Sequence, residues 1–171
     1  HTTVADTMLV EPLMESLGSF IAWSKVQLTI PLAAMFSRFN NSCFFTSLGY
    51  KKDEIATKFY PLLDWNLHYM FTSRRHIVLF PEGKRFCKPY TKPLKRGTIG
   101  YAWSRQMQVQ LGCAFGIEHT LNEFTFRKEY KPCTIEYSIG EIIDPLDFKT
   151  EEEFYQHVSY RFERWFDINY K

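Results

Sequence analysis

The sequence predicts an α/β fold in which a central mixed sheet is flanked by helices. Short apolar segments that end at Pro or Gly alternate with longer segments whose apolar residues recur at helical spacing, and this alternation favours helices packed on a sheet. The 171 residues are enough for one such domain with a substantial core and too few for two. We therefore expect a single domain over residues 1–171. Because the chain begins at His1 without an initiator Met, we also expect a fragment of a longer protein.

The first part of the chain is predicted to be helical. Residues 7–22, with Gly18 among them, carry apolar side chains at helical spacing and predict an amphipathic helix with one broad apolar face. Pro31 can occupy the first turn of a second, short helix over residues 31–36.

The middle of the chain is predicted to hold a helix between two short strands. Residues 43–46 indicate the first strand. Asp53 can cap a helix that runs from Glu54 towards Ser73. The apolar run of residues 76–80 then predicts a buried strand that ends in a turn, because Pro and Gly follow it at once.

The last part of the chain predicts two helices and two strands. The expected elements are a helix over residues 98–106 that starts near Gly97, an interior strand over 109–117, an alternating strand over 133–143 and a final helix from 151 to about 166. Asp144-Pro145 should end the second strand, since Pro cannot continue it. The acidic residues after Thr150 favour the positive end of a helix dipole.

Composition narrows the classes of partner. The net charge of +2 does not by itself indicate a nucleic-acid partner. Aromatic residues make up 18% of the chain, which is typical of a core rich in rings or of an apolar surface that meets lipid or an acyl chain. The four cysteines form no C-x-x-C pair, so we expect reduced thiols and no metal site. The sequence shows no signal peptide and no apolar run approaching about 18 residues.

The segment Phe80-Pro81-Glu82-Gly83-Lys84-Arg85 is the most informative motif. It would present one carboxylate, backbone N–H groups and two cations at one point, which suits an anionic ligand. The alternative is an ordinary turn with solvated charges. More basic residues follow, namely Lys88, Lys92, Lys95 and Arg96. They fit a solvated loop, phosphate, anionic lipid headgroups or nucleic acid, and the strand and turn before them favour a small phosphate site.

His1 and Asp6 form a second motif at the start of the chain. Residues five apart on one helix lie about 140° apart around its axis, so the two side chains can meet only if His1 precedes the helix. In such a pair the Asp6 carboxylate accepts a hydrogen bond from one ring nitrogen and fixes the tautomer, while the other nitrogen takes a proton. The other four histidines have no Asp five residues on.

Together, these motifs closely resemble the glycerolipid acyltransferases, and among them most of all the lysophosphatidic acid acyltransferases. The HX4D motif at His1 and Asp6 precedes Phe80-Pro81-Glu82-Gly83-x-Arg85, and Pro93-Leu94-Lys95-Arg96-Gly97 then leads into a helix. The resemblance covers nearly the whole chain. It implies a glycerolipid acyltransferase-like fold and a membrane-associated enzyme of lipid metabolism whose upstream membrane-anchoring segment is missing here.

The resemblance also implies a reaction and its residues. A fatty acyl group would pass from acyl-CoA or acyl carrier protein (acyl-ACP), as co-substrate, to the free hydroxyl of lysophosphatidic acid in phospholipid biosynthesis. His1 would be the general base and Asp6 would orient it. Glu82, Gly83, Lys84 and Arg85 would shape the acceptor site, with Arg85 a candidate for the phosphate.

Partners and place follow from the same resemblance. The family implies no further cofactor, no nucleic-acid partner, and an endoplasmic reticulum or other intracellular membrane with the site facing the cytosol. Acylation of glycerol 3-phosphate or of another lysophospholipid, and a non-catalytic lipid-binding relative, remain as alternatives.

The sequence departs from the family pattern in three places. The intermediate Gly-x-x-Phe-Ile-x-Arg block corresponds best to residues 41–47, where Ser47 stands in place of Arg. Lys51 or Lys52 could supply the missing cation. Lys84 stands where Thr is frequent, and the strand over residues 109–113 lacks the usual Pro. These departures affect the choice of acceptor more than the chemistry, because His1, Asp6 and Glu82 remain.

Overall fold

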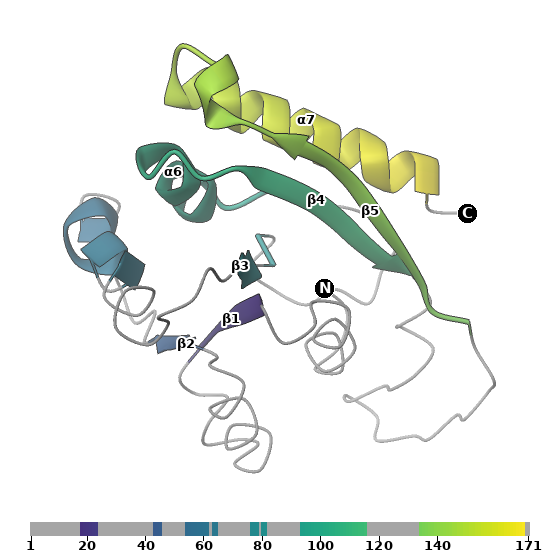
Figure 1. Ribbon diagram of the computed structural model, residues 1–171, viewed down its shortest axis with the longest axis horizontal. Helices are drawn as coiled ribbons and strands as arrows, with labels where there is room; N and C mark the ends of the chain where they lie inside the picture. The colour runs from purple at the N-terminus through teal and green to yellow at the C-terminus, as the bar shows by residue number, and fades with distance from the viewer. Residues whose placement is uncertain are drawn as a thin grey trace. The chain divides into compact units, whose positions relative to one another are not determined.

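The computed structural model describes residues 18–23, 43–45, 54–61, 63–64, 76–78, 80–81, 93–115 and 134–169 (Figure 1). Helices and strands both occur and alternate in part, which confirms the α/β class. The chain divides into two compact units, of which one is Thr7–Leu79 and the other combines His1–Asp6 with Phe80–Lys171. The single acyltransferase domain over residues 1–171 stays a prediction.

A three-stranded parallel sheet lies in the unit Thr7–Leu79. Strand β1 (Gly18–Trp23) is its centre, with β2 (Cys43–Phe45) on one side and β3 (His76–Val78) on the other. Ile21 pairs with Cys43, and Gly18 pairs with His76. Parallel neighbours need long crossover connections, and the chain provides them between these strands.

Strand β1 corrects the prediction of a helix over residues 7–22. Gly18–Trp23 is extended and is paired on both edges, so the helical prediction is wrong there. The segment has a continuous apolar run from Phe20 to Trp23, and a parallel strand covered on both faces shares that pattern with a helix. Pairing with two neighbouring strands decides between them. Residues 7–17 and the short helix expected over 31–36 lie outside the described residues.

The helix expected from Glu54 is present where the structure describes it. Residues 54–61 and 63–64 are helical, with a π-helical turn, η2, at Ile55–Phe59. The Lys58 ammonium donates to the Glu54 carboxylate at 2.5 Å, one turn away. Phe59 and Leu63 are buried, so this side of the helix packs inward. Residues 65–73 of the expected helix lie outside the described part.

An antiparallel hairpin lies in the unit that contains Phe80–Lys171. Strand β4 (Val109–Phe115) pairs with β5 (Glu136–Ile143), from Val109 opposite Ile143 to Phe115 opposite Glu136. The expected strands over 109–117 and 133–143 are thus confirmed with shorter bounds. In the described residues the parallel and antiparallel pairings belong to two separate sheets.

A β-bulge shifts the alternation of β5. The register slips between Gln110 and Gly112, so that β5 carries one extra residue opposite Leu111. Leu111 and Ile143 are buried on one face, whereas Ile139 and Ile142 lie on the other face and are more than half exposed. The simple alternation expected through Ile139 therefore does not run to the end of the strand.

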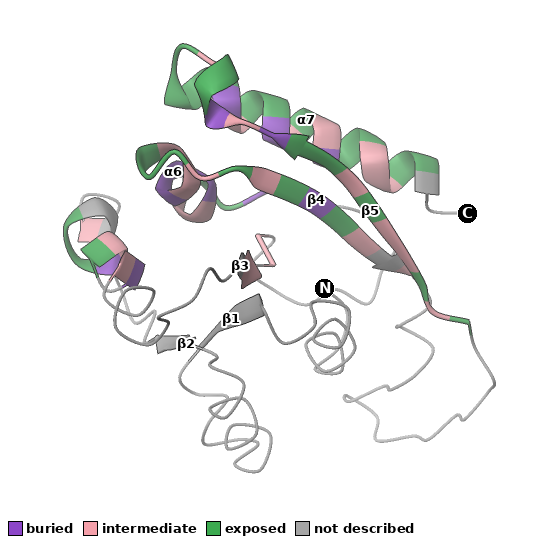
Figure 2. Ribbon diagram, viewed as in Figure 1, coloured by how far each residue is buried: buried purple, intermediate pink, exposed green. Residues whose placement is uncertain are grey.

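Two helices cover the inner face of this hairpin. Helix α6 (Arg96–Ser104) and helix α7 (Glu151–Asn169) pack together, and α7 lies along β5 (Figure 1). The buried core consists of Leu94, Ile99, Leu111, Ile143, Phe154, Val158 and Phe162. Phe154 is fully buried and contacts the rings of Trp103 and Phe148, with centroids 5.7 and 5.5 Å away. Figure 2 shows the buried residues of α7 recurring along the helix, as an amphipathic helix requires.

Helix α6 ends in a left-handed residue. The Met107 amide donates to the Ala102 carbonyl at 2.8 Å and the Gln106 amide to the Trp103 carbonyl at 3.1 Å. Gln106 has a φ of 51°, which glycine usually supplies at this position. These bonds satisfy carbonyls that the helix would otherwise leave open, and the turn leads directly into β4.

The start of α7 follows from its sequence. Asp144 ends β5 and caps the short 3₁₀ helix η4 (Pro145–Asp147), as its carboxylate accepts from the Leu146 amide at 2.9 Å. The Thr150 hydroxyl accepts from the Glu153 amide at 3.2 Å, and the Glu153 carboxylate accepts from the Lys149 amide at 3.0 Å. This arrangement is close to a capping box and confirms the expected helix start. No helix in the described part of the chain is both long and apolar enough to cross a membrane.

Candidate active site

The residues predicted to carry the chemistry lie outside the described residues. They are His1, Asp6, Glu82, Gly83, Lys84 and Arg85. The same holds for Ser47, Lys51 and Lys52. Their roles therefore stay predictions. The structure does describe both ends of the segment that carries the Pro-Glu-Gly motif. One end is Phe80 with Pro81, the first residue of the motif, and the other end is residues 93–97.

One backbone hydrogen bond joins these two ends. The Lys95 amide donates to the Pro81 carbonyl at 2.7 Å. Phe80 and Pro81 are both half-buried. Pro81 is therefore held at a defined place beside the first turn of α6.

The Pro-Leu-Lys-Arg-Gly sequence builds the start of α6. Leu94 is buried in the core and Lys95 is extended at the N-cap position. Arg96 begins the helix, one residue before the expected start near Gly97. The Lys95 side chain makes no capping bond, and the Thr98 hydroxyl donates to the Lys95 carbonyl at 3.1 Å. With no side-chain cap, contacts from another element can add to the stability of this turn.

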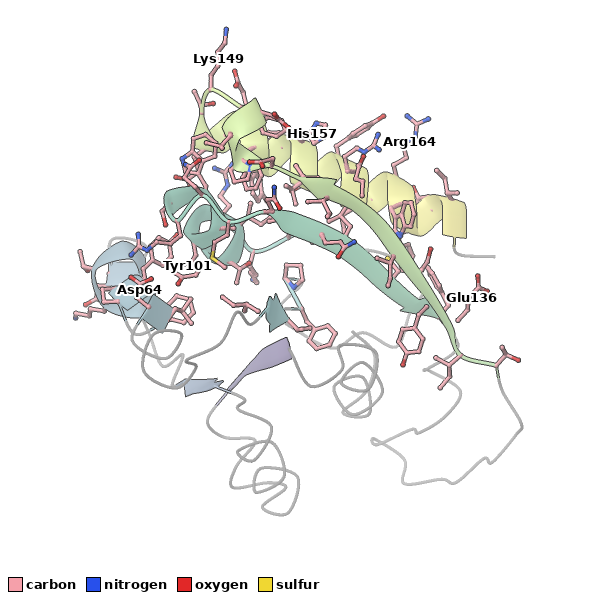
Figure 3. All side chains as sticks on the ribbon, in the orientation of Figure 1. Asp64, Tyr101, Glu136, Lys149, His157 and Arg164 are labelled. Atoms are coloured by element: carbon pink, nitrogen blue, oxygen red, sulfur yellow. The ribbon has the colours of Figure 1, made fainter. Side chains whose placement is uncertain are left out.

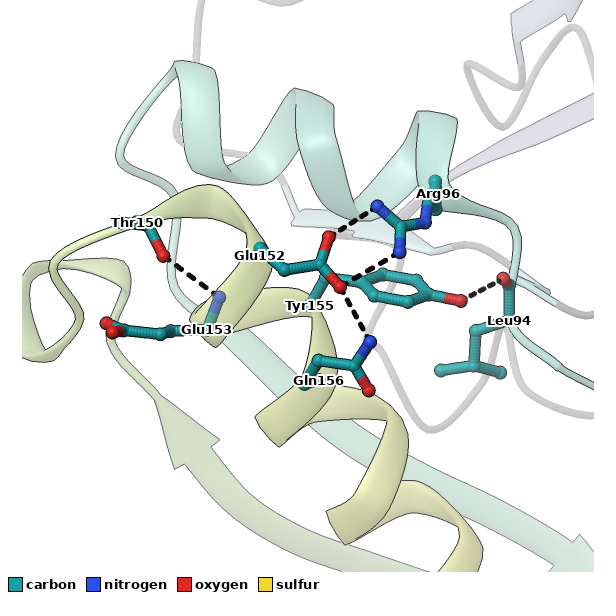
Figure 4. A network of polar contacts seen from close by, with 7 residues as sticks. All are labelled: Leu94, Arg96, Thr150, Glu152, Glu153, Tyr155 and Gln156. Atoms are coloured by element: carbon teal, nitrogen blue, oxygen red, sulfur yellow. Dashed lines mark hydrogen bonds and ion pairs between the residues drawn. The ribbon is translucent and has the colours of Figure 1, made fainter.

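Helix α7 supplies those contacts (Figure 4). Arg96 donates through Nη1 to Glu152 Oε2 at 2.5 Å and through Nη2 to Glu152 Oε1 at 3.0 Å. The Arg96 guanidinium lies 4.4 Å from the centre of the Tyr155 ring. The Tyr155 hydroxyl donates to the Leu94 carbonyl at 3.0 Å. Gln156 completes the network by donating to Glu152 Oε1 at 2.6 Å.

The network changes the protonation equilibria of its charged members. The hydrogen bond from Arg96, followed by the one from Gln156, lowers the pKa of the Glu152 carboxyl below its usual value. The bond to Glu152 likewise raises the pKa of Arg96. Both shifts favour the charged forms, which Arg and Glu already have at neutral pH, so the pair is an ionic, two-pronged contact.

The pairing of Arg96 reduces the set of basic residues that could bind an anionic ligand. Arg96 was one of the cations that could meet phosphate or nucleic acid, but the structure directs its guanidinium to Glu152. The Lys95 side chain is exposed. An anionic ligand would therefore depend on basic residues of the segment other than Arg96.

Glu152 and Tyr155 are residues that the sequence did not assign to the site. The acidic run after Thr150 predicted only a favourable interaction with the helix dipole, yet Glu152 pairs with Arg96 across 56 residues of sequence. No local pattern signals a contact at that separation. Within the described ranges, no three His, Cys, Asp or Glu side chains gather in a way that could hold a metal ion.

The fold is that of a known acyltransferase structure. The chain is similar to the 1-acyl-sn-glycerophosphate (LPA) acyltransferase PlsC from Thermotoga maritima, with a TM-score of 0.65. The two chains therefore share a fold. The expected resemblance is confirmed at that level. Sequence identity is 21%, and the match covers 98% of this chain and 63% of the PlsC chain. No family model and no curated protein matches the sequence.

Proposed function

We propose that this chain is the acyltransferase domain of an enzyme that transfers a fatty acyl group from an acyl thioester to the hydroxyl of lysophosphatidic acid. The observation that carries the proposal is the acyltransferase fold over 98% of the chain. The HX4D and Pro-Glu-Gly motifs of that fold's family stand in this sequence in the same order.

The chemistry assigns a task to each motif. His1 accepts the proton of the acceptor hydroxyl, and Asp6 holds the imidazole in the required tautomer. The hydroxyl oxygen attacks the thioester carbonyl, a C–O bond forms, and the C–S bond breaks with release of the thiol. Backbone N–H groups stabilise the oxyanion that forms between these steps. Glu82, Gly83 and Lys84 shape the acceptor site, and Arg85 binds its phosphate.

A turnover assay with a matched histidine control tests this function. The full-length protein in membranes is given acyl-CoA or acyl-ACP with lysophosphatidic acid, glycerol 3-phosphate or other lysophospholipids. We expect His1→Ala to abolish acylation, while His157→Ala, which removes an exposed histidine from the outer side of α7 (Figure 3), retains it. Unchanged activity in His1→Ala would rule out His1 as the base.

The acceptor and the non-catalytic alternative are separated in the same assay. Turnover with glycerol 3-phosphate or with another lysophospholipid, and none with lysophosphatidic acid, would reassign the acceptor. Ser47, in place of the family's Arg, is the feature that makes a non-catalytic lipid-binding relative worth testing. That alternative predicts tight lysolipid binding without turnover on any acceptor.

The cellular location belongs to the same proposal. The enzyme would work at the endoplasmic reticulum or another intracellular membrane, with its active site facing the cytosol. Membrane fractionation with protease protection of a tagged full-length protein tests this. Recovery in the lumen, protected from protease until detergent is added, would contradict it.

A further inference from the structure

Two ion pairs of the same chemistry attach α7 to different neighbours. Near its start, Glu152 accepts two hydrogen bonds from Arg96 at the start of α6. Further along, Arg161 donates two hydrogen bonds to Glu141 of β5, one of them from Nη2 to Oε2 at 2.7 Å. The side chains of both pairs are exposed, by 60% and 53% in the first and by 41% each in the second.

The first pair differs from the second in that it lies next to a backbone hydrogen bond to Pro81. Its Arg96 is the last of three consecutive residues, 94–96, and each of these residues is held by a separate contact. Tyr155 binds the Leu94 carbonyl, the Lys95 amide binds the Pro81 carbonyl, and Glu152 binds the Arg96 side chain. Two of these three contacts come from α7. The second pair ends on β5, where no such connection to Pro81 is present among the described residues.

The connection reaches the beginning of the predicted site through covalent geometry. The Pro81 carbonyl is part of the planar peptide group that leads into Glu82, so a bond to its oxygen fixes the orientation of that group. Pro81 has a ring-restricted φ, which leaves the chain little freedom at this point. The place and direction in which the Pro-Glu-Gly motif begins therefore depend on where the Lys95 amide lies.

We propose that α7 positions the start of the Pro-Glu-Gly motif, with Glu152 and Tyr155 as positioning residues for the acyl acceptor. This inference rests on the proposed function, because it is the acyltransferase reaction that gives Glu82, Gly83 and Arg85 a role at the acceptor. Glu152 and Tyr155 act through residues 94–96 and make no contact with substrate. The two contacts hold neighbouring residues, so each partly replaces the other.

Steady-state kinetics of the full-length protein in membranes test the proposal. The variants are Glu152→Gln, which keeps the shape of the side chain and removes its charge, and Tyr155→Phe, which keeps the ring and removes the hydroxyl. Glu141→Gln is the matched control. We expect the double variant Glu152→Gln/Tyr155→Phe to lose roughly tenfold in kcat/KM for lysophosphatidic acid, since sub-ångström misplacement of a site costs rate steeply.

The kinetic pattern separates positioning from general loosening. The KM for acyl-CoA should stay at the wild-type value, because the motif is assigned to the acceptor. Each single variant should lose less kcat/KM for lysophosphatidic acid than the double variant. Glu141→Gln should keep the wild-type kinetic constants for both substrates. Exchanging the charges, with Arg96→Glu and Glu152→Arg together, should recover part of the activity that Glu152→Gln loses.

Each outcome bears on one proposal. A wild-type protein that acylates none of the acceptors overturns the proposed function. An active wild type whose double variant behaves like Glu141→Gln, or loses activity equally towards both substrates, overturns the positioning by α7 alone. Thermal unfolding of the same preparations identifies any variant that fails to fold, and Tyr155→Phe then serves as the second, milder variant.

Discussion

The two Arg–Glu pairs of α7 show that identical contacts can differ in consequence. Arg96–Glu152 and Arg161–Glu141 are both two-pronged and exposed, and exposed ion pairs contribute little to stability. The first pair ends beside a backbone bond to Pro81, and the second ends on a strand that the core already holds in place. The difference shows that the importance of an exposed ion pair depends on which neighbouring groups it holds in place, and not on its own contribution to stability.

The largest expected effect tests whether the core, not the ion pairs, holds α7. Phe154 is fully buried two residues beyond Glu152 and contacts Trp103 and Phe148. Phe154→Ala should lower the free energy of unfolding by about 3–5 kcal/mol. Tyr160→Ala, at a side chain that is 55% exposed, is the control and should change it little. Urea unfolding measures both, and equal small losses would mean that the core does not hold the helix.

The next effect concerns the end of α7 that lies near Glu141. A Cβ on Gly140 would lie 3.3 Å from Leu111 Cβ and 3.4 Å from Trp165 of α7. Gly140→Val should therefore cost about 1–3 kcal/mol through overpacking. On the open side, Gly112→Val meets only the Ser138 carbonyl oxygen within 4 Å, at 3.9 Å, and should cost less. Similar losses in both variants would show that this end of α7 is not closely packed.

A smaller effect is expected at the far end of α6. Gln106 has a left-handed backbone, which costs a residue with a Cβ more than it costs glycine. Gln106→Gly should raise the free energy of unfolding by about 1 kcal/mol. Acylation should not change, because the Arg96 end of the helix is untouched. A loss of stability would show that the Gln106 side chain, which donates to the Trp103 carbonyl at 3.0 Å, contributes more than the strain costs.

The smallest effect is the pH dependence of the Arg96–Glu152 pair. Because Arg96 and Gln156 lower the pKa of Glu152 below its ordinary 4.5, the native state binds fewer protons there than the unfolded chain. The resulting stability is present above pH 4.5 and is lost as the pH falls through the lowered value. The advantage of wild type over Glu152→Gln should shrink in the same direction. Urea unfolding from neutral to acidic pH measures it, and an advantage that grows in acid would contradict the ionic pair.

Local signals predicted the elements around α7 well. Thr150 with Glu153 marked the helix start, and Asp144-Pro145 marked the end of β5, because these residues act on neighbouring backbone groups. Such contacts are complete within a few residues of sequence. The strand β5 was found for a similar reason, since the alternation at its start is a local property, and β4 was found from its own run of residues as an interior strand.

Non-local pairing explains what the sequence did not predict. Gly18–Trp23 is a strand because β2 and β3 flank it, and its own apolar run fits a helix as well. The bulge opposite Leu111 depends on the register of two strands. For the site, motif order predicted His1, Asp6 and the Pro-Glu-Gly residues, whereas Glu152 and Tyr155 needed the packing of α7 to be seen.

The attachment of α7 to residues 94–96 uses two contacts that respond differently to dissolved salt. The Arg96–Glu152 contact is between charges in water, and dissolved salt screens such charges over about 8 Å at physiological ionic strength. The bond from the Tyr155 hydroxyl to the Leu94 carbonyl joins neutral, part-buried groups and is insensitive to screening. High salt therefore weakens one contact and leaves the other intact, so that residues 94–96 keep an anchor on α7 across a wide range of ionic strength.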